Sequence, residues 1–206
     1  MKMKQLSLDD FTAKTSSDSP SPGGGSIAAL TGSLAASLAS MVAALTVNKS
    51  GYEEYRAEMT DMLEKCEQLR SRLLDDIDRD CVSFDGYIEA LALPKDTDEQ
   101  KTARREAMQQ ALKHAAEVPL SIAQTSLEVM PLAKAAVMRG NKNAITDGVI
   151  AAMMSRTAVL AALCNVKINL GMIKDKDYTD KIWSVVNRLE QSAIDGEKEI
   201  LSLAKF

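Results

Sequence analysis

The sequence has few aromatic residues and only one histidine. Aromatic side chains make up 4% of the 206 residues, although 46% of the chain is hydrophobic. A core with so few rings must be built from Ala, Leu, Ile, Val and 11 Met, which favours helices over strands. The histidine, His114, has no nucleophile motif around it, so we expect a partly buried packing residue and no catalytic triad.

The sequence also lacks a cysteine framework and a secretory signal. Its three cysteines, Cys66, Cys81 and Cys164, are odd in number, widely spaced and set in apolar periodic stretches. This pattern argues against paired disulfides or a zinc site, and we expect buried thiols in a reducing compartment. Residues 1–14 contain early lysines but no apolar segment of the signal-peptide kind. We therefore expect a cytoplasmic protein.

Clustered positive charge is absent as well. The net charge is −4 and the pI is near 5.2, which argues against a nucleic-acid partner or an anionic membrane surface. Residues 26–47 carry no charge and are long enough to span a bilayer. They consist mainly of Ala, Ser, Thr and Gly, which insert poorly, so we predict a buried helix, no membrane contact, and partners that are small molecules or protein.

The apolar residues that are present recur at helical spacing along most of the chain. No sustained period-two run of β-branched residues and no hairpin signal occurs. We predict an all-α, single-domain helical bundle with long helices over residues 1–206. The expected helices are a short one capped by Ser7, one starting at Ser26, one over 52–93, two or three over 97–139 because of Pro119 and Pro131, and two over 146–171 and 180–203.

A glycine-rich loop precedes the helix that starts at Ser26. Gly23, Gly24 and Gly25 leave their amides free next to a helix N-terminus, where unpaired N–H groups and the helix dipole attract anions. The loop is neither a Walker loop nor a dinucleotide-binding fingerprint, because no Gly-Lys-Ser/Thr follows it and no strand precedes it. Alternatively, the glycines only permit close packing and Ser26 caps the helix.

Polar residues flank an alanine-rich helix further along the chain. Asn141, Asn143 and Asp147 stand before it, while Asn165 and Asn169 stand near its other end. Buried amides are costly unless they are hydrogen-bonded, so these side chains suggest contacts with a planar polar ligand. The alternative is structural, with asparagines in caps and turns and Asp147 as the helix N-cap.

A run of aspartates interrupts the long helix predicted over 52–93. Asp80 lies four residues before Phe84 and seven after Leu73, which places it on the apolar face. Desolvation there would raise the pKa of the carboxyl group, as a general acid or base at neutral pH requires. The alternative is an ion pair with Arg or Lys of a neighbouring helix. No histidine accompanies the run, so no metal site is expected.

Together these segments resemble the cyclodeaminase/cyclohydrolase family of folate enzymes. The matching segments are 21–29, the spacing of Asp80 and Phe84, Pro94-Lys95, Gly140, Asn141, Asn143, Asp147 and 165–170. The resemblance implies an all-α homodimer with folate sites near the subunit interface. It also implies chemistry on the carbon between N5 and N10 of tetrahydrofolate, with a folate as small-molecule substrate and no further cofactor or metal.

The resemblance further implies roles for individual residues. Gly23, Gly24, Gly25 and Ser26 would bind an anionic or carbonyl group, and Asp80 and Asp147 would transfer protons. The residues expected to contact the pterin are Asn141, Asn143, Asn165 and Asn169. We expect cyclisation of 5-formiminotetrahydrofolate to 5,10-methenyltetrahydrofolate with ammonia release. Two alternatives stay open, namely hydrolysis of the methenyl form to 10-formyltetrahydrofolate and a non-catalytic helical ligand-binding or interaction protein.

Overall fold

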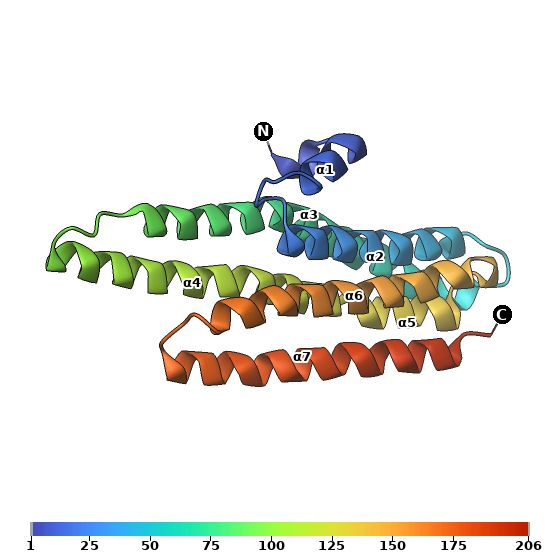
Figure 1. Ribbon diagram of the computed structural model, residues 1–206. Coiled ribbons are helices and arrows are strands. Elements are labelled where there is room, and N and C mark those ends of the chain that lie inside the picture. Colours follow the sequence, from blue (N-terminus) through green and yellow to red (C-terminus); the bar gives the residue numbers. More distant parts are fainter. Residues whose placement is uncertain (1, 206) are drawn as a thin grey trace.

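The computed structural model describes residues 2–205, and within this range it contains helices and no strand. The long helices lie side by side in an elongated bundle, with the short first helix at its edge (Figure 1). Their bounds are α1 Leu8–Thr15, α2 Gly24–Val47, α3 Arg56–Ala92, α4 Asp98–Leu127, α5 Val129–Arg139, α6 Ile145–Leu170 and α7 Lys176–Leu203. The predicted all-α bundle with long helices is confirmed.

Two alanine-rich helices, α2 and α6, form the centre of the bundle. Alanines such as Ala36 and Ala158 are fully buried, and the small side chains let neighbouring backbones approach closely. A Cβ atom at Gly32 of α2 would lie 2.5 Å from Ser126 Oγ of α4. By length and composition alone, both helices could cross a membrane, but the buried core helix of a bundle has the same length and composition. Half of each apolar window is buried within the fold.

Most predicted helix boundaries agree with the structure. Ser7 caps α1 by accepting a hydrogen bond from the Asp10 amide, and the long helix predicted over 52–93 is α3. The region 97–139 divides into α4 and α5, although Pro119 lies inside α4 without ending it. The loss of one N–H at Pro119 is tolerated because another group satisfies the freed carbonyl, as described below.

Two predicted caps are wrong. α2 begins at Gly24 with Gly23 as its N-cap, so Ser26 lies inside the first turn and its hydroxyl is directed elsewhere. α6 begins at Ile145 after a short 3-10 turn, and its N-cap, Ala144, makes no side-chain capping bond. Asp147 is therefore not a cap, because the preceding turn already starts the helix two residues earlier than expected.

Two burial predictions are also wrong. Cys66 and Cys81 are buried, but Cys164 is exposed on α6. The side chain of His114 is 62% exposed. It lies two residues from both Leu112 and Ala116, which face the core, and two residues of a helix correspond to about 200° of rotation. His114 therefore points to solvent.

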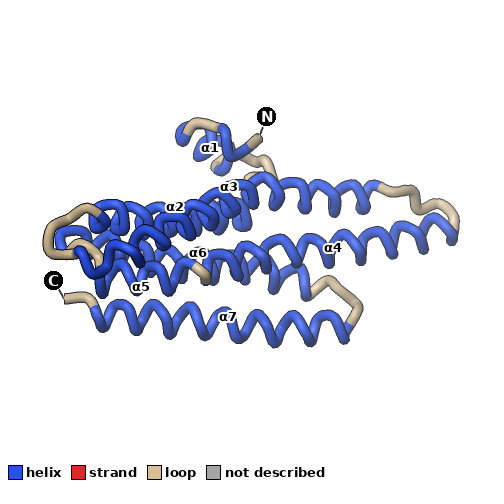
Figure 2. The backbone as a smooth tube through the Cα atoms, turned by 180° about the vertical axis from the view of Figure 1, so that it is seen from behind, coloured by secondary structure: helices blue, strands red, loops and turns tan. Residues whose placement is uncertain are grey.

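The helices α3 and α4 extend past the start of α2 and the end of α6. This overhang is visible from both sides of the molecule (Figure 1 and Figure 2). The chain enters α2 beside the overhanging part of α3 through the loop that contains Gly23. The N-terminus of α2 is thus brought against α3, α4 and the C-terminal end of α6.

Candidate active site

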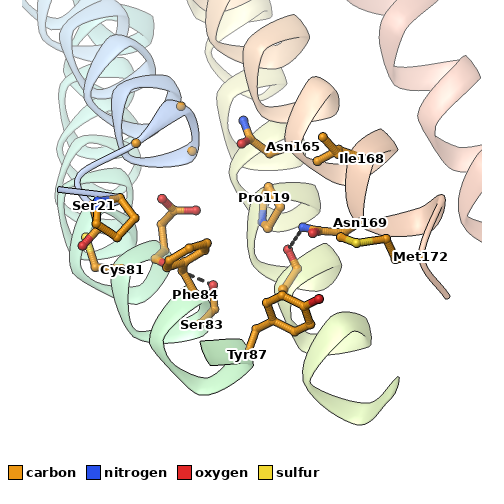
Figure 3. Close-up of a pocket in the computed structure, with 16 residues that line it drawn as sticks. Ser21, Cys81, Ser83, Phe84, Tyr87, Pro119, Asn165, Ile168, Asn169 and Met172 are labelled. Atoms are coloured by element: carbon orange, nitrogen blue, oxygen red, sulfur yellow. Dashed lines mark hydrogen bonds between the residues drawn. The ribbon is translucent and has the colours of Figure 1, made fainter. Parts of the chain in front are cut away.

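A cavity of about 280 Å³ lies at this junction. Its walls come from the loop before α2, from the overhanging part of α3, from α4 around Pro119 and from the last turns of α6 (Figure 3). The predicted residues Gly23, Gly24, Gly25, Asp80, Asn165 and Asn169 all line it. Four chain segments that are far apart in sequence therefore meet in one place.

The glycines of the loop are required by close polar contacts. A Cβ atom at Gly25 would lie 2.5 Å from Asp80 Cγ and would overlap the carboxylate oxygens. A Cβ atom at Gly24 would lie 3.1 Å from Asn165 Nδ2. The structure thus shows the close packing expected as one alternative, and the groups packed against the glycines are polar groups of the cavity. Ligand binding by the loop stays a prediction.

Asp80 is the acidic residue that lines the cavity. The fully buried Ser26 donates a hydrogen bond from Oγ to Asp80 Oδ2 at 2.9 Å. Burial raises the pKa of the Asp80 carboxyl, the hydrogen bonds from Ser26 oppose this rise, and the negative charge of Asp76 adds to it. The side-chain partner of Asp80 is thus the hydroxyl of Ser26, and the predicted position on the apolar face is confirmed.

The other aspartates of the run have structural contacts. Asp78 accepts a hydrogen bond from the Met3 amide at 2.6 Å, and Asp75 pairs with Lys4. Both contacts attach the N-terminal segment to α3. Asp76 is fully buried and pairs with Arg79 on its own helix. Asp80 is the member of the run that lines the cavity.

The amides of Asn165 and Asn169 are held by carbonyl groups of the bundle. Asn165 Nδ2 donates to the Ala161 carbonyl at 3.0 Å. Asn169 Nδ2 donates to the Ala115 carbonyl at 2.7 Å (Figure 3). Because Pro119 has no N–H, the carbonyl four residues before it lacks its helical donor, and Asn169 supplies one. Each bond uses one of the two amino hydrogens and fixes the orientation of the amide, and both side chains keep their Oδ1 atoms as acceptors for the N–H groups of a ligand.

Three predicted site residues lie elsewhere. Asp147 and Asn165 are 18 positions apart on α6, which corresponds to about 27 Å. At the start of α6, far from the cavity, Asn141 Oδ1 accepts a hydrogen bond from the backbone N–H of Asn143 at 3.1 Å. The backbone N–H of Asn141 donates to Thr46 Oγ1 at 2.8 Å. Within one chain the structure therefore does not bring Asn141, Asn143 and Asp147 to the cavity. They lie at the start of α6, whereas the cavity lies at its C-terminal end.

Several cavity residues were not singled out as contacts from the sequence. Phe84 and Tyr87 of α3 face the cavity, as do Ile168 and Met172 at the end of α6 (Figure 3). Phe84 and Tyr87 follow Asp80 by four and seven residues, so helical spacing could have identified them from the sequence as neighbours of Asp80 on the same face. Aromatic and aliphatic side chains at these positions provide an apolar wall suited to a flat ring.

The chemistry available in the cavity is proton transfer and polar recognition. It offers a carboxyl group of raised pKa, two amide oxygens, the free N–H groups at the start of α2 and an aromatic wall. Residues 2–205 contain no group of three or more His, Cys, Asp or Glu side chains placed to hold a metal ion. The arrangement suits a reaction in which protons move between nitrogen, oxygen and carboxylate.

The chain is similar in sequence to known proteins. The formiminotransferase-cyclodeaminase family model matches residues 7–188. The methenyltetrahydrofolate cyclohydrolase of Methylorubrum extorquens is 37% identical over 174 residues, which cover 84% of each chain. The formimidoyltransferase-cyclodeaminase of Sus scrofa is 33% identical over 186 residues, or 90% of this chain. That alignment covers 34% of the Sus scrofa protein, so the chain spans about a third of this longer relative.

A solved structure supports the same relationship. The crystal structure of formiminotetrahydrofolate cyclodeaminase from Thermotoga maritima superposes with a TM-score of 0.88 at 27% sequence identity. The superposition covers 98% of this chain and 97% of that one. The similarity therefore extends over the whole bundle, including the helices that form the cavity.

Proposed function

The chain belongs to the formiminotransferase-cyclodeaminase family of folate enzymes, and we propose that its cavity converts 5-formiminotetrahydrofolate to 5,10-methenyltetrahydrofolate with release of ammonia. The observation that carries this proposal is the Asp80 carboxyl, which lines the cavity with a raised pKa and a hydrogen bond from Ser26. The similarity to the Thermotoga maritima cyclodeaminase over nearly the full length of both chains supports the same reaction.

Asp80 has a role in each proton movement of this reaction. N10 attacks the carbon of the protonated formimino group (N5–CH=NH2+), a C–N10 bond forms as the C=N electron pair moves onto the nitrogen, and the Asp80 carboxylate takes the proton from N10. The protonated carboxyl then gives that proton to the amino group, and the C–N bond breaks as ammonia leaves. The nitrogen lone pairs form the methenyl bridge. A carboxyl group with a raised pKa is both a stronger base and a usable acid near neutral pH.

The rest of the cavity is suited to binding the substrate. The Oδ1 atoms of Asn165 and Asn169 can accept hydrogen bonds from pterin N–H groups, while Phe84 and Tyr87 cover a ring face. The amides at Gly24 and Gly25 can bind a carbonyl or carboxylate oxygen. Every step is a proton transfer or a C–N bond change, so we also propose that no metal or additional cofactor is needed.

A second candidate function is hydrolysis of 5,10-methenyltetrahydrofolate to 10-formyltetrahydrofolate. The alignment with the Methylorubrum extorquens cyclohydrolase, which covers the same share of both chains, favours it. In this reaction water adds to the methenyl carbon and Asp80 accepts its proton. Asp80 then passes the proton to N5 as the C–N5 bond breaks, and the added hydroxyl loses its remaining proton to solvent as it becomes the formyl carbonyl. The same carboxyl group serves both reactions because each passes through a tetrahedral carbon between two nitrogens.

Parallel assays with the two substrates test the proposal. Purified protein in chelator-containing buffer should convert 5-formiminotetrahydrofolate with a gain in methenyl absorbance and stoichiometric ammonia. With 5,10-methenyltetrahydrofolate as substrate, a loss of this absorbance faster than the buffer reaction would identify the hydrolase instead. Without turnover of either folate, and with no rise in melting temperature at saturating tetrahydrofolate, the chain would not be a folate enzyme.

The substitution Ser26→Ala should change the pH dependence of turnover. The hydroxyl of Ser26 stabilises the charged form of Asp80, so its removal should raise the pKa of Asp80 further. The reaction begins with Asp80 as a base, and the acidic limb of the kcat profile should therefore move to higher pH. Ser83→Ala is the matched control, because Ser83 Oγ bonds to the Asp80 backbone carbonyl and not to its carboxylate. Equal shifts in both variants would contradict the role of Ser26.

A further inference from the structure

A second buried carboxylate lies one helical turn from the cavity. Asp76 of α3 is fully buried and precedes Asp80 by four residues, which places both side chains on the same face of the helix. Residues with this spacing have Cβ atoms about 5 to 6 Å apart. Asp76 is not among the residues that line the cavity, so a ligand in the cavity has no direct contact with it.

The position of Asp76 is costly for the fold. Its Oδ1 atom pairs with Arg79, but its Oδ2 atom is buried and has no hydrogen-bond partner in residues 2–205. A buried carboxylate has to bond through both oxygens to offset the loss of water, and an apolar side chain of similar size is often at least as stable. Stability alone therefore does not account for an acid at this position, and such exceptions are typical of functional sites.

The surroundings of Asp76 and Asp80 screen charge poorly. The neighbouring side chains Leu73 and Ile77 of α3 are buried in the same core cluster as the start of α2. α2 itself carries no charged residue from Gly24 to Val47. Water and counter-charges that would weaken the repulsion between two carboxylates are thus largely excluded from this side of α3.

The charged groups of α3 leave a negative charge beside Asp80. Burial raises the pKa of the Asp76 carboxyl, the positive charges of Arg79 and Arg72 oppose this rise, and the negative charge of Asp75 adds to it. The side chain of Arg79 is 51% exposed, so water screens its charge more than it screens the charge of the buried Asp76. The pKa of Asp80 is raised by its own burial and also by Asp76, while Arg79 does not offset that rise.

The other elements beside this turn carry charged groups with partners of their own. On the α4 side, the exposed His114 lines a small surface cavity with Arg79 and lies near Glu117. In the N-terminal segment, Lys4 pairs with Asp75. Neither cation pairs with Asp76 in residues 2–205, so no charge from another element cancels its effect.

We propose that Asp76 is a second acidic residue of the folate reaction, which does not touch the substrate but acts on Asp80 through its buried negative charge. Arg79 favours the charged form of Asp76, whereas Asp80 has a hydroxyl and no cation as its side-chain partner. Asp80 is therefore the member of the pair that takes up and releases the proton, and Asp76 is a positioning residue that strengthens it as a base. This inference rests on the proposed folate reaction.

Removal of the charge at position 76 tests this role. Asp76→Asn keeps the shape of the side chain and its acceptor for Arg79. Asp80 then loses a repulsive neighbour, so the acidic limb of the kcat profile should move to lower pH, opposite to the shift expected for Ser26→Ala. The expected shift is about one pH unit, for two charges about 6 Å apart at an effective dielectric constant of about 20 to 80. Asp75→Asn removes the same charge from an exposed site and should shift the limb far less.

A direct titration separates this role from the folate reaction. With isotope-labelled aspartate carboxyl groups, NMR follows the protonation of Asp76 and Asp80 in the free protein. Because coupling between two sites is reciprocal, Asp76→Asn should lower the midpoint of Asp80 by as much as Asp80→Asn lowers that of Asp76. An unchanged Asp80 midpoint in Asp76→Asn would overturn the proposal. A reciprocal shift in a protein that turns over neither folate would refute the folate reaction and leave the coupling in place.

The kinetic constants distinguish this role from a merely structural one. Asp76 does not touch the substrate, so the variant should keep a KM close to that of the wild type. A raised KM with an unmoved pH profile would show a structural role and contradict the proposal. Asp76→Leu provides the same test if the melting temperature shows that Asp76→Asn does not fold, because leucine also lacks the charge and suits a fully buried position.

Discussion

Replacement of Asp80 by asparagine should lower kcat by about two to four orders of magnitude, the usual contribution of a positioned acid or base. The side chain lies against Gly25, receives a hydrogen bond from Ser26 and has a pKa raised by burial. Asparagine preserves its shape and its acceptor for Ser26 but cannot carry a proton between nitrogens. Binding of tetrahydrofolate, measured by the rise in melting temperature, should be retained.

The same substitution should not weaken the fold at neutral pH. Because burial raises the pKa of Asp80, the native state holds the proton more tightly than the unfolded chain does. As pH rises from the unfolded pKa through the raised native one, the unfolded chain loses its proton first and the free energy of unfolding falls. Removing the charge should therefore raise the melting temperature at neutral pH, with no such gain below the unfolded pKa.

Asp75→Asn provides the control for this variant. Asp75 belongs to the same acidic run, but its side chain is 57% exposed and pairs with Lys4 outside the cavity. Its turnover should remain close to that of the wild type. A variant Asp80→Asn that turns over within a few-fold of the wild type would remove Asp80 from the mechanism. A large loss in both variants would point to damage of α3 as a whole.

Replacement of Gly25 by alanine should abolish most activity through a single methyl group. The new Cβ would overlap the Asp80 carboxylate and lie 2.5 Å from its Cγ, so either α2 or Asp80 has to move. A displacement of about 1 Å at a reacting group costs on the order of 100-fold in rate. Forced overpacking of a buried position costs about 1 to 3 kcal/mol in the free energy of unfolding. The loss of rate is measured as kcat, and the loss in the free energy of unfolding is measured by urea denaturation.

Gly86→Ala separates this clash from the general effect of replacing a glycine in a helix. Gly86 lies in α3 near the cavity, yet a Cβ atom there would meet nothing within 4 Å. Alanine is favoured over glycine inside a helix, so this variant should gain about 0.5 to 1 kcal/mol and keep its turnover. Normal activity in Gly25→Ala would show that the loop does not fix the position of Asp80.

The sequence by itself determined the fold class and the chemical character of the site. Apolar residues at helical spacing, the absence of alternating strands and the position of Pro94 and the glycine loop were enough to predict the long helices. Helical periodicity also placed Asp80 on the buried face of α3, and the structure confirms that position. These properties are local, since they depend on which residues lie three or four positions apart.

Only the tertiary structure decided which of the polar residues share a cavity. Periodicity identifies the face of a helix on which a residue lies but not the segment it meets, so the bond between Ser26 and Asp80, 54 residues apart, was not predictable. The same holds for Asn169, which satisfies the carbonyl freed by Pro119, and for Gly25, which lies against Asp80. Asn143 and Asp147 look equivalent to Asn165 in sequence, yet both lie at the start of α6, and about 27 Å of this rigid helix separates Asp147 from Asn165.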